Sequence, residues 1–153
     1  MENPATYGEF QFFILAPQEL NEAFRIIEPG LQTIQRKAAV SWDVMDLPVQ
    51  IQANLCTLIL IYSQERYAGF LIVRHRYLGA PNRHYLDVAA MFGEQWCFKE
   101  GHDIKAAATE WLKKFGNEYG CSAIIQNITK LGWARPLEKL GFKKVQETWI
   151  KEV

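Results

Sequence analysis

The segment from Glu100 to Lys105 contains residues whose types and spacing could bind an anion. Gly101 provides a turn, and an amphipathic helix begins directly after Asp103. Amides at a helix N-terminus point toward an anion, and the helix dipole favours its negative charge. The amides concerned belong to Gly101, His102, Asp103, Ile104 and Lys105. Without any ligand, Asp103 is explained as the helix N-cap and Gly101 as a turn residue, and both interpretations remain open.

Histidines and cysteines are the residues that could bind a transition metal. His75, His84 and His102 are scattered along the chain, with no carboxylate or cysteine at ligand spacing. Because zinc-binding sequences carry closely spaced pairs of such ligands, we predict that the chain has no metal site. Cys121 directly follows a helix stop and is better explained as a small residue packed at the start of a strand than as a nucleophile.

Composition excludes several classes of partner. The 17 basic and 17 acidic residues leave no net charge that would attract nucleic acid or anionic lipid, so neither partner is predicted. The basic and aromatic group from Arg74 to Tyr77 is better explained as a solvated hairpin tip than as a nucleic-acid contact. The longest apolar runs are too short to span a membrane, and no targeting signal is visible. An odd number of cysteines, three, favours reduced thiols and a cytoplasmic protein.

The last third of the chain predicts the element that positions the Glu100–Lys105 segment. Apolar residues recur there at steps of three and four: Ile104, Ala108, Trp111, Leu112, Phe115 and Tyr119. This spacing predicts an amphipathic helix over roughly 103–119, capped by Asp103 and ended by Gly120. The run 121–125 predicts a central strand, buried on both faces. A short helix containing Pro136 ends at Gly141, and 142–153 predicts a closing strand.

The first two thirds predict strands and helices in a defined order. We expect a strand over 11–15, a helix over 18–27 that Pro29 and Gly30 end or kink, and further helical turns over 31–39. The segment 41–54 stays undecided: Ser41 could cap a helix, and Pro48 opposes a long one. The runs 55–62, 68–75 and 84–91 are rich in β-branched and aromatic residues and predict an antiparallel meander. The length of 153 residues predicts one domain, spanning 1–153.

This order of elements resembles the GNAT acetyltransferase superfamily. The matching residues lie within roughly 60–150 and include Gly120-Cys121 and the run Leu137-Glu138-Lys139-Leu140-Gly141-Phe142. In that family the corresponding short-helix motif typically reads Tyr-Glu-Lys-Leu-Gly-Phe. The narrower pattern Gly120-Cys121, Gly132-Trp133-Ala134-Arg135, Gly141-Phe142 is similar to small GNAT-like proteins of tailed bacteriophages. The resemblance implies an α/β (α+β) fold, with a mixed, mostly antiparallel sheet and helices on both faces.

The resemblance also places an acetyl-CoA pyrophosphate loop on residues 100–105. The family pattern there is Gln or Arg, two residues, Gly, one residue, then Gly or Ala, whereas this chain has Glu100, Asp103 and Lys105 at those three places. Each acidic side chain would repel a pyrophosphate by roughly 1 kcal/mol, which His102 and Lys105 offset in part. These departures from the family pattern favour a protein that does not bind acetyl-CoA over one that does. The cluster Trp96-Cys97-Phe98 either lines the pantetheine slot or plugs it.

The catalytic groups that the resemblance implies are incomplete. Many family members use the Tyr of the short-helix motif as the acid, and Leu137 stands there. Glu94 and Asp87 lie near the usual position of the carboxylate that takes the proton of the amine, directly or through water. Asp87 is equally explained as a charge on a solvated strand face.

Two functions follow from this pattern. The departures at residues 100–105 and at Leu137 favour an inactive GNAT-fold phage protein that binds a virion or host protein. Such a protein would reside in the host cytoplasm or in the virion. The alternative is an acetyl-CoA-dependent N-acetyltransferase acting on an amine of a protein or a small molecule. A homo-oligomer is compatible with both, and nothing in the sequence identifies an interface.

Overall fold

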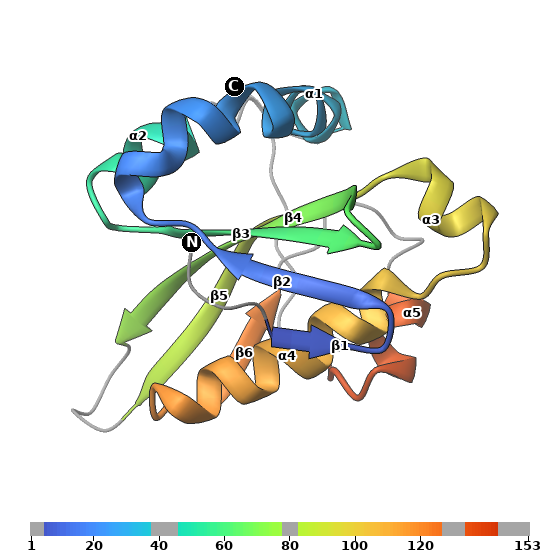
Figure 1. The fold of residues 1–153 in the computed structure, drawn as a ribbon. Helices are drawn as coiled ribbons and strands as arrows, with labels where there is room; N and C mark the ends of the chain where they lie inside the picture. Colours follow the sequence, from blue (N-terminus) through green and yellow to red (C-terminus); the bar gives the residue numbers. More distant parts are fainter. Residues whose placement is uncertain (1–4, 38–45, 78–82, 127–133, 144–153) are drawn as a thin grey trace, which may run out of the picture.

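A six-stranded sheet runs through the molecule, and helices cover both of its faces (Figure 1). The computed structural model describes residues 5–37, 46–77, 83–126 and 134–143. The strands are β1 (Ala5–Tyr7), β2 (Phe10–Ile14), β3 (Thr57–Ser63), β4 (Arg66–Tyr77), β5 (His84–Gly93) and β6 (Ala123–Gln126). The helices are η1 (Pro17–Glu19), α1 (Leu20–Lys37), α2 (Asp46–Gln52), α3 (Gln95–Lys99), α4 (Ile104–Glu118) and α5 (Ala134–Lys139).

The strands are ordered in the sheet as they are in the sequence, from β1 to β6. Every neighbouring pair is antiparallel except β5 with β6, which is parallel because α4 carries the chain back before β6 begins. The predicted fold class is therefore confirmed: a mixed, mostly antiparallel sheet with helices on both faces. The predicted antiparallel meander is also confirmed, as β3, β4 and β5.

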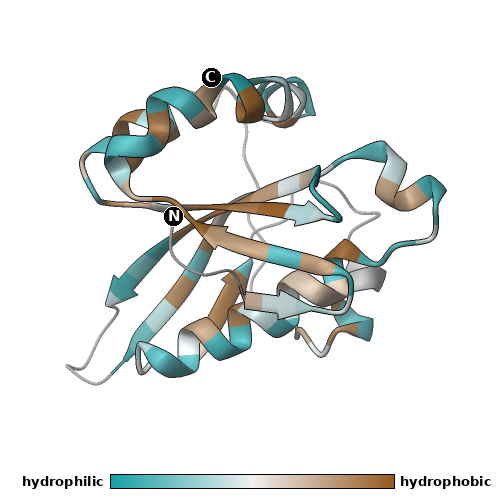
Figure 2. Ribbon diagram, in the orientation of Figure 1, coloured by the Kyte–Doolittle hydropathy of each residue, from teal (hydrophilic) through white to brown (hydrophobic). Residues whose placement is uncertain are grey.

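Along the central strands, side chains alternate between the two faces of the sheet, which divides the hydrophobic core into two layers. In β3, Leu58 and Leu60 face α1 and α2, whereas Ile59 and Ile61 face α4. All four are buried on one side of the sheet or the other, as expected when both faces of a strand are covered. Figure 2 shows the result as a largely apolar sheet between helices whose outer surfaces are hydrophilic.

Helix α4 forms as the sequence predicts. The carboxylate of Asp103 accepts a hydrogen bond of 3.0 Å from the amide of Ala106, and Gly120 has the positive φ of 71° that suits a helix stop. Tyr119 is a correction to the predicted apolar stripe, because 56% of it is exposed. The buried stripe therefore ends at Phe115, one turn earlier.

The sequence predicted that Pro29 and Gly30 either end or kink the helix. Helix α1 continues past Pro29, so the first of these two outcomes was wrong. It continues as one helix to Lys37, with the buried side chains of Ile27 and Leu31 on either side of the proline. A proline inside a helix costs about 3 kcal/mol, whereas burying one such side chain contributes about 1.5–3 kcal/mol. The apolar contacts of this helix with the sheet therefore outweigh the proline.

The remaining differences between the predicted and the observed structure concern short strands and helices. The sequence did not predict β1, which pairs with β2 through a turn where Gly8 has a φ of 58°. Segment 41–54 contains α2, with Pro48 in its first turn, and Ser41 lies outside the described residues. Strand β6 is half-buried and not fully covered, and the predicted closing strand lies almost entirely outside the described part. No helix in the described ranges is both long and apolar enough to cross a membrane.

Candidate active site

Strand β5 extends beyond the part of it that pairs with β6. They pair only from Tyr85 with Ala123 to Val88 with Gln126. Beyond Val88, β5 continues to Gly93 with no partner on that side among the described residues. Some of the amides and carbonyls of residues 89–93 point to this side, where they have no ladder partner among the described residues, and an extended ligand can pair with them as an added strand would. We call this edge the β5 slot.

A bulge in β5 lies where the slot begins. Val88 pairs with Val73 and Ala90 pairs with Ile72, so Ala89 has no register partner on β4. Both Ala89 and Ala90 pack toward the α1 and α2 layer, which breaks the alternation of the strand. The extra residue of a bulge is left unpaired in the ladder, and bulges are over-represented beside active sites. The bulge at Ala89 therefore lies where the β5 slot begins.

The far end of the slot leads to the N-terminus of α4. Gly101 has a φ of 76°, and a Cβ added there would meet no other atom within 4 Å. Asp103 caps α4, as one of the two sequence interpretations predicted, and Ile104 is buried beneath it. A ligand anion at this helix end would lie close to the capping carboxylate, which reduces its affinity.

The other charged residues of this loop have partners. The Nδ1 atom of His102 lies 2.5 Å from a carboxylate oxygen of Glu9. The carboxylate of Glu100 lies 3.6 Å from the guanidinium of Arg66, so its charge is partly balanced. Lys105 lies 5.8 Å from the centre of the Phe98 ring, and burial lowers the pKa of its ammonium group while the nearby Asp103 opposes this shift. The repulsion predicted from Glu100 is thus weaker than the sequence alone indicated.

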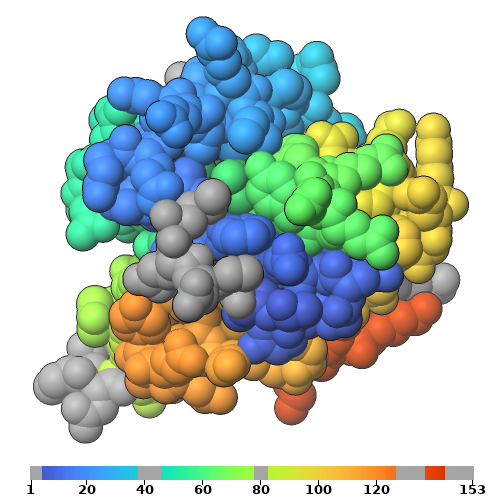
Figure 3. Space-filling view, in the orientation of Figure 1, coloured from blue at the N-terminus to red at the C-terminus, as the bar shows by residue number. Residues whose placement is uncertain are grey.

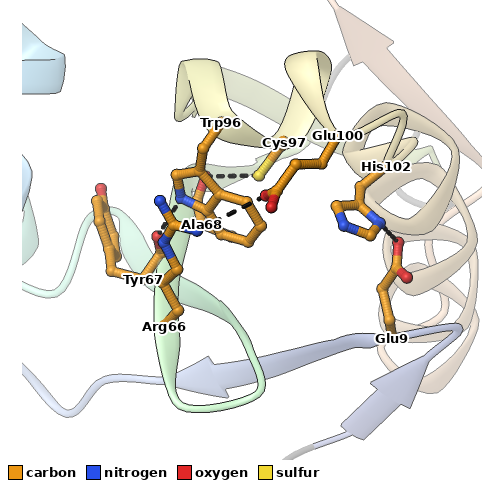
Figure 4. A network of polar contacts seen from close by, with 8 residues as sticks. All are labelled: Glu9, Arg66, Tyr67, Ala68, Trp96, Cys97, Glu100 and His102. Atoms are coloured by element: carbon orange, nitrogen blue, oxygen red, sulfur yellow. Dashed lines mark hydrogen bonds and ion pairs between the residues drawn. The ribbon is translucent and has the colours of Figure 1, made fainter.

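A network of polar contacts fixes α3 and the following loop to the start of β4 (Figure 4). The indole of Trp96 donates a hydrogen bond of 3.0 Å to the carbonyl of Tyr67, and the guanidinium of Arg66 lies 4.1 Å above the indole ring. These contacts place Trp96 on the β4 side of β5, whereas the slot is on the β6 side. Of the two open alternatives, the described contacts show Trp96 docked on the sheet and do not show it plugging the slot.

Glu94 directly follows β5, at the end of the slot. Its amide donates a hydrogen bond of 2.7 Å to the carbonyl of Ala68, and its half-buried side chain precedes α3. Burial, and then the charge of Glu94, raises the pKa of the Cys97 thiol to about 11. The same two causes, in the same order, raise the pKa of the Tyr67 phenol. The charge of Glu94 therefore acts on two buried groups that lie on the β4 side of β5.

Asp87 corrects the expectation of a solvated strand charge. Only 2% of it is exposed, and one carboxylate oxygen lies 3.2 Å from Arg74 Nε and 2.9 Å from Arg76 Nε. Its other oxygen, Oδ1, has no hydrogen-bond partner among the described residues. Because the register places Asp87 directly opposite Arg74, this carboxylate is a structural partner of two arginines.

Two further residues bear on proton transfer. Leu137 is buried in α5, which agrees with its inability to serve as an acid. The sequence reasoning missed Tyr67, whose buried hydroxyl has no hydrogen-bond partner within the described ranges. Only the apolar character of its strand was visible in the sequence.

The structure brings together residues that the sequence analysis considered scattered. His75, His84 and Cys121 have potential ligand atoms within 4.8 Å of one another, although they are not closely spaced in the sequence. Burial, and then the neighbouring His84, lowers the pKa of the His75 ring. His102, in contrast, lies with Glu9 and away from this group.

A hollow of about 150 Å³ lies elsewhere, between the first two strands and α4. Tyr7, Trp111 and Lys114 are among the residues that line it. None of the predicted site residues lines this hollow, so we do not assign it to the candidate active site.

Comparison with known proteins identifies the fold. A scan against protein-family models finds no match, and neither does a search of curated proteins. Among solved structures, a ribosomal-protein-alanine N-acetyltransferase from Brucella melitensis biovar Abortus 2308 has a TM-score of 0.68 at 14% identity, over 94% of this chain and 99% of that one. A predicted acetyltransferase from Clostridium acetobutylicum, solved with acetyl-CoA, has a TM-score of 0.66 at 14% identity, over 94% and 96%.

A third similar structure binds an aminoglycoside. It is an aminoglycoside acetyltransferase from an uncultured soil metagenomic sample, in complex with sisomicin, with a TM-score of 0.66 at 13% identity over 95% of this chain and 97% of that one. These matches cover nearly the whole chain in each case. The chain therefore has the fold of the GNAT acetyltransferases, as the sequence resemblance implied.

Proposed function

We propose that this protein is an acetyl-CoA-dependent N-acetyltransferase that acts on an amine. The observation that carries the proposal is the β5 slot, whose open edge begins at the Ala89 bulge and leads to the N-terminus of α4. A similar fold has been solved with acetyl-CoA, and others are acetyltransferases by name. Proteins of this fold thus carry the same activity with different amine acceptors, and the acceptor of this chain is proposed only as an amine.

The described residues fit the cofactor in two places. The open edge of residues 89–93 offers amides and carbonyls to the pantetheine arm. The N-terminus of α4 and Lys105 offer positive potential to the pyrophosphate, and the carboxylate of Asp103 opposes it. Phe98 is half exposed beside Lys105 and adds an apolar surface next to this end of the slot.

In the proposed reaction, Ala89 and Glu94 have separate roles. When bound, acetyl-CoA supplies a thioester whose carbonyl carbon accepts the amine nitrogen and whose sulfur leaves as a thiolate. The backbone amide of Ala89, which has no register partner on β4, would donate a hydrogen bond to the carbonyl oxygen, where negative charge develops. Glu94 would accept the proton of the amine, directly or through a water molecule. Asp87 is left out of this step because two arginines hold it in the core.

The inactive phage scaffold that the sequence departures favoured has less support than this proposal. None of the similar structures described above is a phage or virion protein. The loop carboxylate of Glu100 is partnered by Arg66, and Trp96 is docked away from the slot. A protein partner and the oligomeric state stay untested predictions.

Binding of acetyl-CoA is the direct test. At a concentration of about 100 times its dissociation constant, the cofactor should stabilise the fold by roughly 2.7 kcal/mol, which thermal unfolding detects. Hydrogen exchange should show protection of the amides of residues 89–93 and 101–105, with α1 as an internal control. No stabilisation at millimolar acetyl-CoA would contradict the proposal. Binding without transfer to any amine in a panel would leave a cofactor-binding protein and would contradict the enzymatic part.

A further inference from the structure

A cluster of one thiol and two imidazoles lies at the opposite end of β5 from the slot. His84 is the first residue of β5, whereas the slot begins only after Val88. His75 lies near the end of β4, and Cys121 lies just before β6. The cluster therefore gathers residues from three separate strand ends.

Two of the three distances between the ligand atoms are close to those of a tetrahedral metal site. His75 Nδ1 lies 2.8 Å from His84 Nε2, and Cys121 Sγ lies 3.7 Å from the same Nε2 atom. Zinc bonds of about 2.0–2.1 Å to nitrogen and about 2.3 Å to sulfur place tetrahedral ligands roughly 3.3 Å (N to N) and 3.6 Å (N to S) apart. The sulfur is already at that spacing from His84 Nε2, the two imidazole nitrogens need to separate by about half an ångström, and all three ligand atoms lie within 4.8 Å of one another.

The sheet holds these three side chains in place before any metal arrives. Tyr77 pairs with His84 in the β4 and β5 register, which places His75 diagonally opposite His84 on the same face. The carbonyl of His84 accepts hydrogen bonds of 2.7 Å from the amide of Ser122 and 3.1 Å from its hydroxyl. These bonds fix Cys121, the residue before Ser122, beside the His84 ring.

Aromatic rings restrict the orientation of the imidazoles. The Tyr77 ring stacks on His84 with centroids 4.3 Å apart and an interplanar angle of 16°. His75 contacts the rings of Phe115 and Tyr119 at centroid distances of 5.9 and 5.2 Å. A site whose ligands are already oriented loses less side-chain entropy when it binds an ion.

We propose that His75 Nδ1, His84 Nε2 and Cys121 Sγ form a binding site for a single zinc ion. Two imidazoles and one thiolate are a ligand set that suits zinc, and a solvent molecule would complete four-coordination. The ion replaces the hydrogen bond between the two rings, so the ring that donates it moves its proton to its other nitrogen. The thiol proton is released to solvent, and no oxidation or reduction takes place.

The site has a structural consequence that is independent of the proposed acetyl transfer. A metal bound there would join the start of β6 to the ends of β4 and β5, on the face that α4 covers. Because β6 pairs with the sheet over only four residues, this link would hold the strand that lies next to the start of the slot.

Metal binding can be measured on the wild-type protein first. Cobalt(II) added to the reduced protein should give a thiolate-to-metal charge-transfer band that saturates at one ion per chain. Zinc should displace the cobalt and release about one proton per ion, as deprotonation of one thiol requires. Zinc should also protect Cys121 from alkylation, since Cys56 and Cys97 are only 3% and 0% exposed. No charge-transfer band, or unprotected Cys121 at saturating zinc, would overturn the proposal.

Matched variants test the individual ligands. Cys121→Ser and His84→Asn should each weaken zinc binding by more than about 100-fold, beyond the 10- to 100-fold cost of losing an outer-shell partner. Cys56→Ser and His102→Gln remove the same residue types outside the cluster and should leave zinc affinity within about twofold. Equal affinity in Cys121→Ser and wild type would contradict the assignment, and the wild-type measurements decide the matter if a variant does not fold.

Discussion

The carboxylate of Asp103 provides the sharpest test of how this chain binds acetyl-CoA. It caps α4 through an exposed hydrogen bond of 3.0 Å, in the place where the proposed site must accept a pyrophosphate. Asp103→Asn keeps a good N-cap while it removes the charge, so the free energy of unfolding should change by less than about 1 kcal/mol. Two unit charges about 4 Å apart in a water-like environment repel by about 1 kcal/mol. Acetyl-CoA affinity should therefore increase about fivefold or more.

Titration calorimetry at low and high salt measures this effect. The gain should shrink as ionic strength rises, because salt screens the repulsion between exposed charges. Asp103→Ala should show the same gain in affinity but lose about 1 kcal/mol of stability with the cap. Glu110→Gln, which removes an exposed charge farther along the same helix, should leave affinity unchanged. Equal or weaker binding by Asp103→Asn at low salt would refute the placement of the pyrophosphate at this helix end.

Three further predictions follow from the packing and the proposed chemistry. Glu94→Gln should lower kcat by roughly 10²–10⁴-fold with little change in acetyl-CoA affinity, and an unchanged kcat would exclude Glu94 as the base. In urea unfolding, Asp87→Asn should cost about 1.5–3 kcal/mol because it removes the charge from the buried partner of two partly exposed arginines. Glu100→Gln, in an exposed pair, should cost less than about 1 kcal/mol. Gly30→Ala should cost about 1–3 kcal/mol, because its Cβ would lie 2.6 Å from an aromatic ring. Gly116→Ala, whose Cβ meets only an ordinary 3.5 Å contact, should be neutral or stabilising, and equal losses in both glycine variants would contradict this account.

The strongest local patterns predicted the fold well. The apolar spacing from Ile104 to Phe115 and the cap at Asp103 predicted α4 almost to the residue. The three β-rich runs of the middle segment predicted β3, β4 and β5, because turns between them are short and the hydrophobic pattern is continuous. The prediction for the helix around Pro29 was weaker, since the contacts that keep it intact come from residues distant in sequence.

The candidate site depended on contacts that a sequence does not display. Arg74 lies opposite Asp87, and hairpin register alone would have indicated their pairing. The diagonal relation of His75 to His84 followed from the same register. Cys121 lies beside these two histidines because β6 pairs in parallel with β5. Helix α4 separates β5 from β6 in the sequence, so no local pattern could have predicted that Cys121 lies there. The Ala89 bulge likewise appears only once the two strand registers are known.

The uneven attachment of β6 has a consequence for how the molecule moves. The space-filling view shows α1 packed over one layer and α4 over another, with the β1 and β2 hairpin on the surface between them (Figure 3). Strands β3 and β4 pair with a neighbour on both edges and β5 pairs along one edge and part of the other, whereas β6 is held by four residue pairs and is half-buried. In native-state hydrogen exchange, we expect β6 to open with a lower free energy than the meander, as a separate cooperative unit. Such local opening would widen the space at the start of the β5 slot for a bulky acceptor, while the rest of the sheet stays folded.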